Sequence, residues 1–440
     1  MNLADMLCYA DIDQLTRIAA TYGCECSSHS KNDLIQTILS TIYRREALES
    51  RMAELGADDL RFLNSLLFEN RSAYSLEELR ARAGGTAAGS WLRLQQDPAG
   101  AGSPQLQQQA GSAGLMRPRD ESAAKSRASG VPSPAGKTRR GRRKNQPQPE
   151  PAPEVPADPA RQMITRFRLN GWLFNGCSQQ TRFLFQVPED VRRRLRETLE
   201  RQFLTRAERR EEPPVYRDES HLMAEDLAVF LRYVRDHDVP LTADGTMYKR
   251  QLGQVLELMS AQESVPGKGE WRFGYGRKFR EYPDRFSLLY DFAYCEGLVR
   301  EQPDRLVLTE EGLEVASGRA PVDTERLYRL WLRIYKGPID NLTALVHWIA
   351  RLAGEWTTVA SLFEILRPII RPYYYDDEKA ILERRILRMM LHLGLLRWGE
   401  TETGEPVVKM TPHGQSIVIG TVLPYEDLLR FDESGMTFPT

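Results

Sequence analysis

Apolar residues recur at helical spacing near the start of the chain. They are Leu3, Met6, Leu7, Leu15, Ile18, Ala19, Leu34, Ile35, Ile38, Leu39 and Ile42. Intervals of three and four residues place side chains on one helix face, so this pattern predicts three short helices that share an apolar face. Two further helices are predicted over 60–68 and 76–83, and Ser75 with Glu78 has the spacing of a capping box. Residues 1–85 are therefore expected to form a small helical module.

The helical pattern stops at about residue 85. From there to about residue 160 the composition is dominated by Ala, Gly, Ser, Gln and Pro, with almost no aromatic or branched apolar residues. Such a segment cannot bury enough apolar surface to offset the conformational entropy that folding removes. We expect residues 86–160 to be a disordered linker.

Aromatic and aliphatic residues are distributed throughout 161–424, which predicts one continuous folded region followed by a tail at 425–440. A short signature recurs in this region: an apolar residue, Thr, two variable residues and Gly. Its copies are Leu-Thr-Ala-Asp-Gly at 241–245, Leu-Thr-Glu-Glu-Gly at 308–312 and Met-Thr-Pro-His-Gly at 410–414. Before the last two copies, a Gly-Leu-apolar-Arg step begins at Gly297 and at Gly394.

These steps predict a helix that ends at Gly297 or Gly394, then a strand, a polar turn and a return strand. Glycine at a helix C-terminus readily takes the left-handed conformation, and the Thr of the signature can cap a following helix. The preceding helices carry their own apolar stripes, namely Phe286, Leu289, Tyr290 and Ala293 in one and Ile381, Ile386, Met389, Met390 and Leu393 in the other. A single Thr-x-x-Gly arises by chance at turns, but the matched upstream steps favour a structural repeat.

A helix followed by a two-stranded hairpin is the arrangement of a winged helix. The predicted fold is mainly α with small β wings: a helical N-terminal module, a disordered linker and a C-terminal array of winged-helix-like units. The predicted helices at 60–68 and 76–83 resemble half of such a unit.

Charge and cysteine content limit the ligands and the cellular compartment that we expect for the protein. The formal net charge is only -1, so affinity for nucleic acid would have to come from local clusters of Lys and Arg. The five cysteines, Cys8, Cys24, Cys26, Cys177 and Cys295, are too few and too irregularly spaced for a disulfide framework. We therefore expect a reducing compartment, with the cytoplasm as the default. No secretion signal and no membrane-spanning stretch is apparent, so we expect no membrane association.

Motifs for catalysis and metal binding are weak. Gly130 and Gly136-Lys137-Thr138 resemble a phosphate-binding loop, but five residues separate the glycines where that loop has four. Cys24, Cys26 and His29 could begin a metal site, but structural zinc normally has two ligand pairs, so small buried cysteines and a loop histidine are favoured. No Gly-x-Ser-x-Gly elbow or His-Glu-x-x-His motif is present. We expect neither an enzyme nor a bound metal or cofactor.

Three segments are candidates for nucleic-acid contact, and the first is in the linker. Between residues 117 and 144, ten basic residues accompany only two acidic ones. The densest part is Arg139, Arg140, Arg142, Arg143 and Lys144. Closely spaced cations on a flexible chain can neutralise phosphates and release their counterions. The alternative is a linker that only keeps the chain soluble.

The second segment is 271–280, where the aromatic residues at 271, 273 and 275 would share one face of a strand. Its cations are Arg272, Arg277, Lys278 and Arg280. Aromatic rings interleaved with cations can stack bases and hold phosphates, but the same alternation describes a strand that packs its rings in a core. We expect core packing for the rings, and the cations remain candidates.

The third segment is Lys249 and Arg250, at the start of a helix whose Leu252, Val255, Leu256 and Met259 are expected to face inward. Cations in a first helical turn oppose the helix dipole, which suggests either a phosphate contact or a salt bridge to Glu257. The arginines at 192, 193, 194 and 196 are offset by neighbouring acidic residues and are expected to form a solvated, internally paired helix face.

Two stretches of the chain resemble known domains. The segment from about residue 222 to residue 318 resembles the helicase-associated, winged-helix-containing domain of XPB-type repair helicases and of bacterial relatives that lack a motor, and the residues that carry the likeness are 239–250, 297–300 and 306–312. No motor follows here, so the resemblance implies DNA association without helicase activity. Residues 3–42 resemble a SAP or Rho-N type module through 15–19, 22–23 and 30–35. Such modules usually bind nucleic acid.

Together these features predict a non-enzymatic nucleic-acid-binding accessory or regulatory protein. DNA is the expected ligand, and a helicase or another DNA-processing protein is the candidate partner. The alternative is a protein-interaction scaffold, because winged helices also serve protein contacts. A contiguous cationic face on the folded units would favour DNA, whereas an acidic or apolar face would favour a protein partner.

Overall fold

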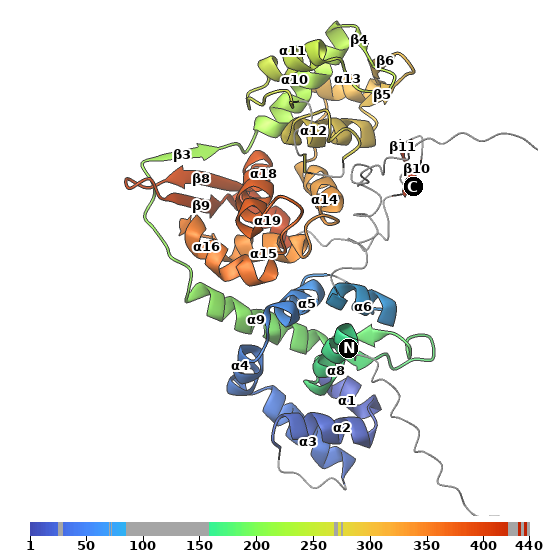
Figure 1. Cartoon of the computed structure of the whole chain (residues 1–440), viewed down its shortest axis with the longest axis vertical. Helices are drawn as coiled ribbons and strands as arrows, with labels where there is room; N and C mark the ends of the chain where they lie inside the picture. The colour runs from blue at the N-terminus through green and yellow to red at the C-terminus, as the bar shows by residue number, and fades with distance from the viewer. Residues whose placement is uncertain are drawn as a thin grey trace, which may run out of the picture. The chain divides into compact units, whose positions relative to one another are not determined.

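Short helices are the main elements of the computed structural model, and its sheets are small (Figure 1). The structure describes residues 1–24, 30–69, 71, 73–84, 158–267, 272–273 and 276–420, together with the backbone of 430–432 and 435–437. Within these residues the prediction of a mainly α fold with small β elements is confirmed. The linker predicted at 86–160 lies outside the described residues except at its last three positions. In the predicted tail, only the backbone of β10 (Arg430–Asp432) and β11 (Gly435–Thr437) is described, as an antiparallel pair.

The N-terminal residues form helices where the apolar pattern placed them. These helices are α1 (Leu3–Tyr9), α2 (Ile12–Thr21), α3 (Lys31–Ile42), α4 (Arg45–Ala53), α5 (Ala57–Leu67) and α6 (Leu76–Gly84). The predicted apolar positions, Leu15 and Ile18 among them, are buried, except for Leu39, which is half-buried. The Ser75 hydroxyl oxygen accepts the backbone N–H of Glu78 at 3.1 Å, which is one of the two bonds of the predicted capping box. The Glu78 carboxylate accepts from Arg71 and Arg82 and does not supply the second bond. Helix α4 was not predicted, because it buries only Leu48 and Met52 and has little periodicity to detect.

The segment after the linker completes this helical module. It comprises α8 (Pro159–Leu169), β1 (Phe174–Asn175), β2 (Phe185–Gln186) and α9 (Glu189–Leu204), and it is followed by β3 (Val215–Asp218), which belongs to a later sheet. Helix α8 packs against α2 and α6, and Tyr74 and Phe185 exchange two backbone hydrogen bonds. The described residues resume at Asp158, whose side chain caps α8 by accepting the N–H of Ala160, so helical structure is present before the predicted boundary at 161.

The next region is a unit with the order helix, strand, helix, helix, hairpin, helix. Its elements are α10 (Leu222–Asp236), β4 (Val239–Pro240), α11 (Lys249–Leu258), α12 (Asp284–Cys295), β5 (Val299–Glu301), β6 (Arg305–Leu308) and α13 (Glu310–Ala316). The strands form an antiparallel sheet in the order β4-β6-β5. We call residues 222–316 the first repeat unit.

After α14 (Thr324–Tyr335) the same order returns, and we call residues 342–420 the second repeat unit. Its elements are α15 (Leu342–Leu352), β7 (Thr357–Thr358), α16 (Val359–Leu366), η1 (Arg367–Ile369), α17 (Glu378–Ala380), η2 (Ile381–Leu387), α18 (Arg388–His392), β8 (Leu396–Glu400), β9 (Pro406–Met410) and α19 (Pro412–Gly420). The sheet order is β3-β8-β9-β7, so the three strands inside the unit have the same neighbours as those of the first, and β3 extends the sheet.

The repeated signature has the same geometry in both units. Gly297 and Gly394 have φ of 67° and 69°, the left-handed conformation predicted for helix ends. The Thr309 hydroxyl donates to the Gly297 carbonyl at 2.7 Å and accepts the N–H of Gly312 at 3.0 Å. Thr411 makes the equivalent bonds to Gly394 at 2.8 Å and Gly414 at 2.9 Å. Each threonine therefore ties the end of one helix to the start of the next across the hairpin.

The third copy of the signature, 241–245, is different. Thr242 accepts the N–H of Thr246 at 3.2 Å, and Gly245 has a φ of 67° in a tight turn. The next helix, α11, begins only at Lys249 and has Tyr248 at its N-cap. This copy is a turn between β4 and α11 and not a helix cap.

The glycines of the two true copies allow the hairpin and the following helix to approach closely. A Cβ on Gly312 would lie 2.0 Å from the Leu298 carbonyl oxygen, and one on Gly414 would lie 2.1 Å from that of Leu395. Both separations are far below a van der Waals contact, and the obstructing atoms belong to backbone that cannot rotate away.

Alanine at Gly312 or Gly414 is therefore expected to destabilise the fold by roughly 1–3 kcal/mol, because the hairpin and helix must move apart. Gly253 of α11 provides a matched control, since nothing lies within 4 Å of its Cβ position. Alanine at Gly253 is expected to stabilise its helix by about 0.5–1 kcal/mol. Urea unfolding midpoints measure both effects. A Gly414→Ala midpoint equal to that of wild type would contradict the close packing.

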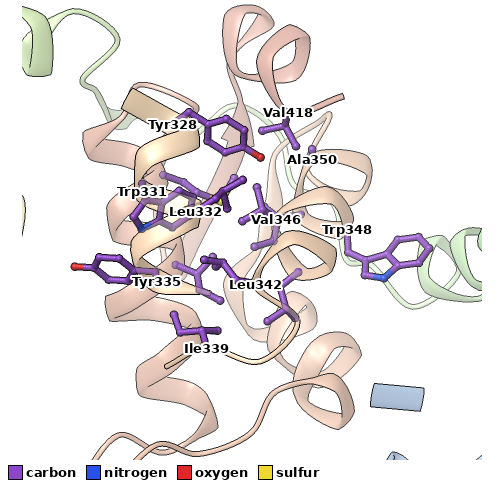
Figure 2. Packing of buried hydrophobic residues seen from close by; sticks show 14 of the residues in the cluster. Tyr328, Trp331, Leu332, Tyr335, Ile339, Leu342, Val346, Trp348, Ala350 and Val418 are labelled. Atoms are coloured by element: carbon purple, nitrogen blue, oxygen red, sulfur yellow. The ribbon is translucent and has the colours of Figure 1, made fainter. Parts of the chain in front are cut away.

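Large aromatic and aliphatic side chains join α14 to the second repeat unit. Figure 2 shows Leu332 of α14 directed toward α15, whose Val346 lies between Leu332 and Val418 of α19, whereas the Trp331 ring lies on the other side of α14. All four are buried, and full burial of such side chains contributes about 1.5–3 kcal/mol each. Trp348 projects from another side of α15, and its Nε1 donates to Asn64 Oδ1 of α5 at 2.7 Å.

Candidate nucleic-acid interface

The third helix of the first repeat unit, α12, has almost no exposed face. All nine residues from Arg285 to Ala293 are buried. Arg285 and Asp226 are both 0% exposed, and Arg285 Nη2 lies 2.7 Å from Asp226 Oδ2. This contact is an ion pair without the alignment of a hydrogen bond. Helix α12 therefore serves the core and cannot be inserted into a groove of DNA.

The third helix of the second repeat unit does present cations. It runs without interruption through α17, η2 and α18, from Glu378 to His392. Arg384 and Arg388 are four residues apart and both exposed. In the described part of the chain, neither forms an ion pair or a hydrogen bond. We call Arg384 and Arg388 the arginine face.

A π-helical segment, Ile381–Leu387, lies in the middle of this helix and contains Arg384. Such segments are rare and are frequently found at functional sites, where they redirect side chains. Here the buried side chains of the segment are Ile381, Leu382, Ile386 and Leu387. The arginine face therefore lies opposite a well-packed apolar face.

A pocket of about 620 Å³ opens beside the arginine face, and we call it the arginine pocket. Its exposed lining residues, the rim, are Gln262, Ser264, Tyr375, Arg384 and Arg388. The more buried inner wall includes Glu263, Arg272, Asp284, Asp376 and Arg385. The pocket thus lies where the second repeat unit meets the loop before α12 and the start of that helix.

The acidic groups of the inner wall already have hydrogen-bond partners within the protein. Asp284 accepts from Arg272 at 3.0 Å and from Arg385 at 2.7 Å, and Arg385 also donates to Asp376 at 2.8 Å. Glu263 accepts two backbone N–H groups at the start of α12, and burial raises its pKa despite these bonds. The inner wall is therefore close to neutral, and the excess positive charge lies on the rim.

A second ionic cluster fixes the end of the arginine-bearing helix. His392 Nδ1 lies 2.8 Å from the carboxylate of Glu219, which is fully buried next to β3, and Arg217 approaches the same carboxylate at 2.6 Å. Burial alone would raise the pKa of Glu219, but the hydrogen bond with His392 and the nearby cations lower it. This cluster holds α18 against the segment that follows β3.

Two of the predicted contact residues are engaged inside the protein. Arg272 bonds to Asp284 and to the Tyr282 carbonyl at 2.7 Å. Arg277 forms a two-pronged pair with Glu301 at 2.9 and 3.0 Å, and its guanidinium lies 3.5 Å from the centre of the Tyr294 ring. Both side chains are committed to these partners, which leaves them little freedom to reach a phosphate.

The strand predicted over 271–280 is not formed at the described positions, where Arg272 and Phe273 are irregular and 277–280 form a turn. Phe273 is 1% exposed, so core packing of this ring is confirmed. The prediction of a strand from the alternating pattern was wrong at these positions because ion pairs and ring contacts hold the segment in place without a strand partner.

The remaining predicted cations are more accessible. Lys249 and Arg250 are exposed in the first turn of α11, and neither pairs with Glu257 or any other described acid. The Lys278 ammonium donates to the Asp244 carbonyl at 2.8 Å, in the turn that leads to α11, so the structure brings Lys278 close to this pair. Arg280 is exposed. The linker cations Arg139, Arg140, Arg142, Arg143 and Lys144 lie outside the described residues.

The arginines of α9 differ in part from the prediction of a solvated face. Arg193 is exposed and lies 3.9 Å from Glu197, as expected. Arg192, however, is buried and donates to the carbonyls of Glu69 and Arg71. Arg194 donates to the Tyr43 carbonyl. Arg192 and Arg194 therefore bind α9 to the N-terminal part of the chain.

Sequence reasoning did not single out Arg384 and Arg388. Their spacing opposite the apolar stripe that contains Ile386 and Met390 was a usable signal, since it places two cations on the solvent side of a predicted third helix.

Within the described ranges, no helix is long and apolar enough to cross a membrane. In those same ranges, no cluster of side chains could hold a metal ion, and Cys26 and His29 lie outside them.

Comparison of the chain with protein-family models, with curated proteins and with solved structures finds no match.

Proposed function

We propose that the chain is a non-enzymatic, cytoplasmic nucleic-acid-binding accessory protein built on two winged-helix units. The order of helices and strands in the two repeat units, and their shared sheet order, support this assignment. The resemblance of 222–318 to the helicase-associated domain belongs to the same proposal, as does that of 3–42 to a SAP or Rho-N module. DNA is the proposed ligand, and a helicase or other DNA-processing protein is the proposed partner.

The arginine face is the observation that carries the proposal. In helix-turn-helix proteins the recognition helix enters the major groove, and arginine there can bind guanine edges or phosphates. Arg384 and Arg388 lie on the helix that takes this place in the second repeat unit, and they are exposed without acidic partners among the described residues. The equivalent helix of the first unit is buried, so that unit acts as a platform.

Other cations extend this interface. Lys249 and Arg250 are exposed on α11, and Lys278 lies beside the turn that precedes them. The basic run of the linker adds electrostatic attraction that does not depend on sequence. In this proposal the second repeat unit orients the protein on DNA, and the linker increases its overall affinity.

The protein-interaction scaffold remains the second candidate, and the burial of α12 favours it. The first repeat unit uses its third helix entirely for packing within the chain, and this use supports a role of that helix position in protein contacts. A scaffold would have no need for the two exposed arginines of the second unit.

The full-length protein is expected to bind duplex DNA with an affinity that falls steeply with salt. Between about 50 and about 200 mM salt, a protein that contacts 6–10 phosphates loses on the order of a thousandfold or more in affinity. Fluorescence anisotropy with a labelled duplex measures this dependence. Salt-insensitive binding, or no binding at micromolar protein, would favour the scaffold.

A further inference from the structure

We infer that the arginine pocket accepts one unpaired nucleotide, with its phosphate at Arg384 and Arg388 and its base against Tyr375. This inference rests on the proposed function and deepens it: the protein would prefer DNA with a single-stranded segment next to a duplex. Three features of the pocket support it: its size, the distribution of its charges and the exposure of Tyr375 on its rim.

The pocket has a suitable size. Its volume of about 620 Å³ lies within the ~300–1,000 Å³ typical of pockets that bury small ligands. An intact base pair in a stacked duplex could not enter a side pocket of this kind, whereas one nucleotide that has left the stack could. The pocket adjoins the arginine face, so a strand held by those arginines would pass its opening.

Charge differs between the rim and the inner wall. Arg384 and Arg388 on the rim are the cations without acidic partners among the described residues, and they favour a phosphate there. The carboxylates of Asp284 and Asp376 on the inner wall disfavour a second anion deeper in the pocket, even though arginines pair with them. A ligand with an anionic end and a neutral polar end fits this distribution, and a nucleotide within a strand is such a ligand.

The base has an aromatic partner on the rim. Tyr375 is 82% exposed, which is unusual for a ring of this size at the edge of a pocket. Tyr373 and Asp376 exchange two backbone hydrogen bonds, so Tyr374 and Tyr375 form the tip of a tight turn. Tyr374 has a φ of 54°, a conformation that costs energy for any residue except glycine and that clusters at binding sites. The turn therefore holds Tyr375 out at the rim, where a base could stack on it.

Anisotropy titrations of the full-length protein test the inference with two probes, a blunt duplex and the same duplex with a short single-stranded overhang. We expect wild type to bind the overhang probe more tightly. Tyr375→Ala should reduce that preference by about five- to 100-fold, because stacking on one base is lost. Tyr375→Trp should keep the preference, because it retains a stacking surface.

Phe183→Ala is the matched control, since Phe183 is 70% exposed in the connection between β1 and β2 and does not line the pocket. This variant should bind both probes as wild type does. If wild type binds the two probes equally, or if Tyr375→Ala keeps the preference for the overhang, the inference is overturned while duplex binding still supports the proposed function. If wild type binds neither probe, the proposed function fails and the inference fails with it.

Discussion

Replacing both Arg384 and Arg388 with Glu is expected to weaken duplex binding by on the order of 100-fold at low salt. The change removes two exposed cations from the arginine face and places two anions where phosphates would lie. The slope of log affinity against log salt should fall by about two, because each phosphate contact contributes about 0.9 to that slope. If the arginines contact phosphates, the affinity for every duplex sequence should fall by a similar factor.

The matched control changes charge by the same amount elsewhere. Arg232 on α10 and Lys336 after α14 are both exposed, and neither lines the arginine pocket. Arg232→Glu with Lys336→Glu should reduce affinity only slightly, through net charge. Equal loss in the two double variants would mean that binding responds to overall charge and not to the arginine face.

Asp226→Ala is expected to lower the free energy of unfolding by about 3–5 kcal/mol. The Asp226 carboxylate is fully buried, lies 2.7 Å from Arg285 Nη2, and accepts the backbone N–H of Ser260 at 2.7 Å. Its removal takes away the carboxylate that forms an ion pair with the buried Arg285 cation. A thermal or urea unfolding curve of the full-length protein measures the loss.

The double variant Asp226→Leu with Arg285→Met separates the buried charge from the other contacts. It should recover part of the stability that Asp226→Ala loses, because neither charge of the pair remains buried, although the N–H groups of Ser260 and Ala261 still lack their acceptor. If Asp226→Ala unfolds at the same midpoint as wild type, the ion pair does not hold α12 to α10 as described.

Local signals in the sequence predicted much of the fold correctly. The signature containing Thr309 and Thr411 predicted the local geometry correctly because each threonine side chain bonds to the glycine before the hairpin and to the glycine after it, and both glycines are part of the pattern. Apolar periodicity placed the N-terminal helices because their cores are built from residues a turn or two apart. The copy at Thr242 failed because the same four residues can close a turn without starting a helix.

The candidate site was less predictable, because a free cation and a paired cation look alike in sequence. Arg277 is held by Glu301, which is far away along the chain, and Arg385 joins Asp284 to Asp376 through tertiary packing. Only the folded arrangement shows that Arg384, next to Arg385, is exposed without an acidic partner among the described residues. For the same reason, no local pattern showed that α12 would be buried.

The central claim is that a folded surface binds DNA in addition to the linker. The most direct measurement is the low-salt duplex affinity of full-length protein in which Arg139, Arg140, Arg142, Arg143 and Lys144 are alanine, with and without Arg384→Glu and Arg388→Glu. We predict that the linker variant still binds in a salt-dependent way and that the two glutamates weaken this remaining binding at least about tenfold. If both proteins bind equally weakly, the repeat units do not read DNA, and a protein partner becomes the better account of residues 158–420.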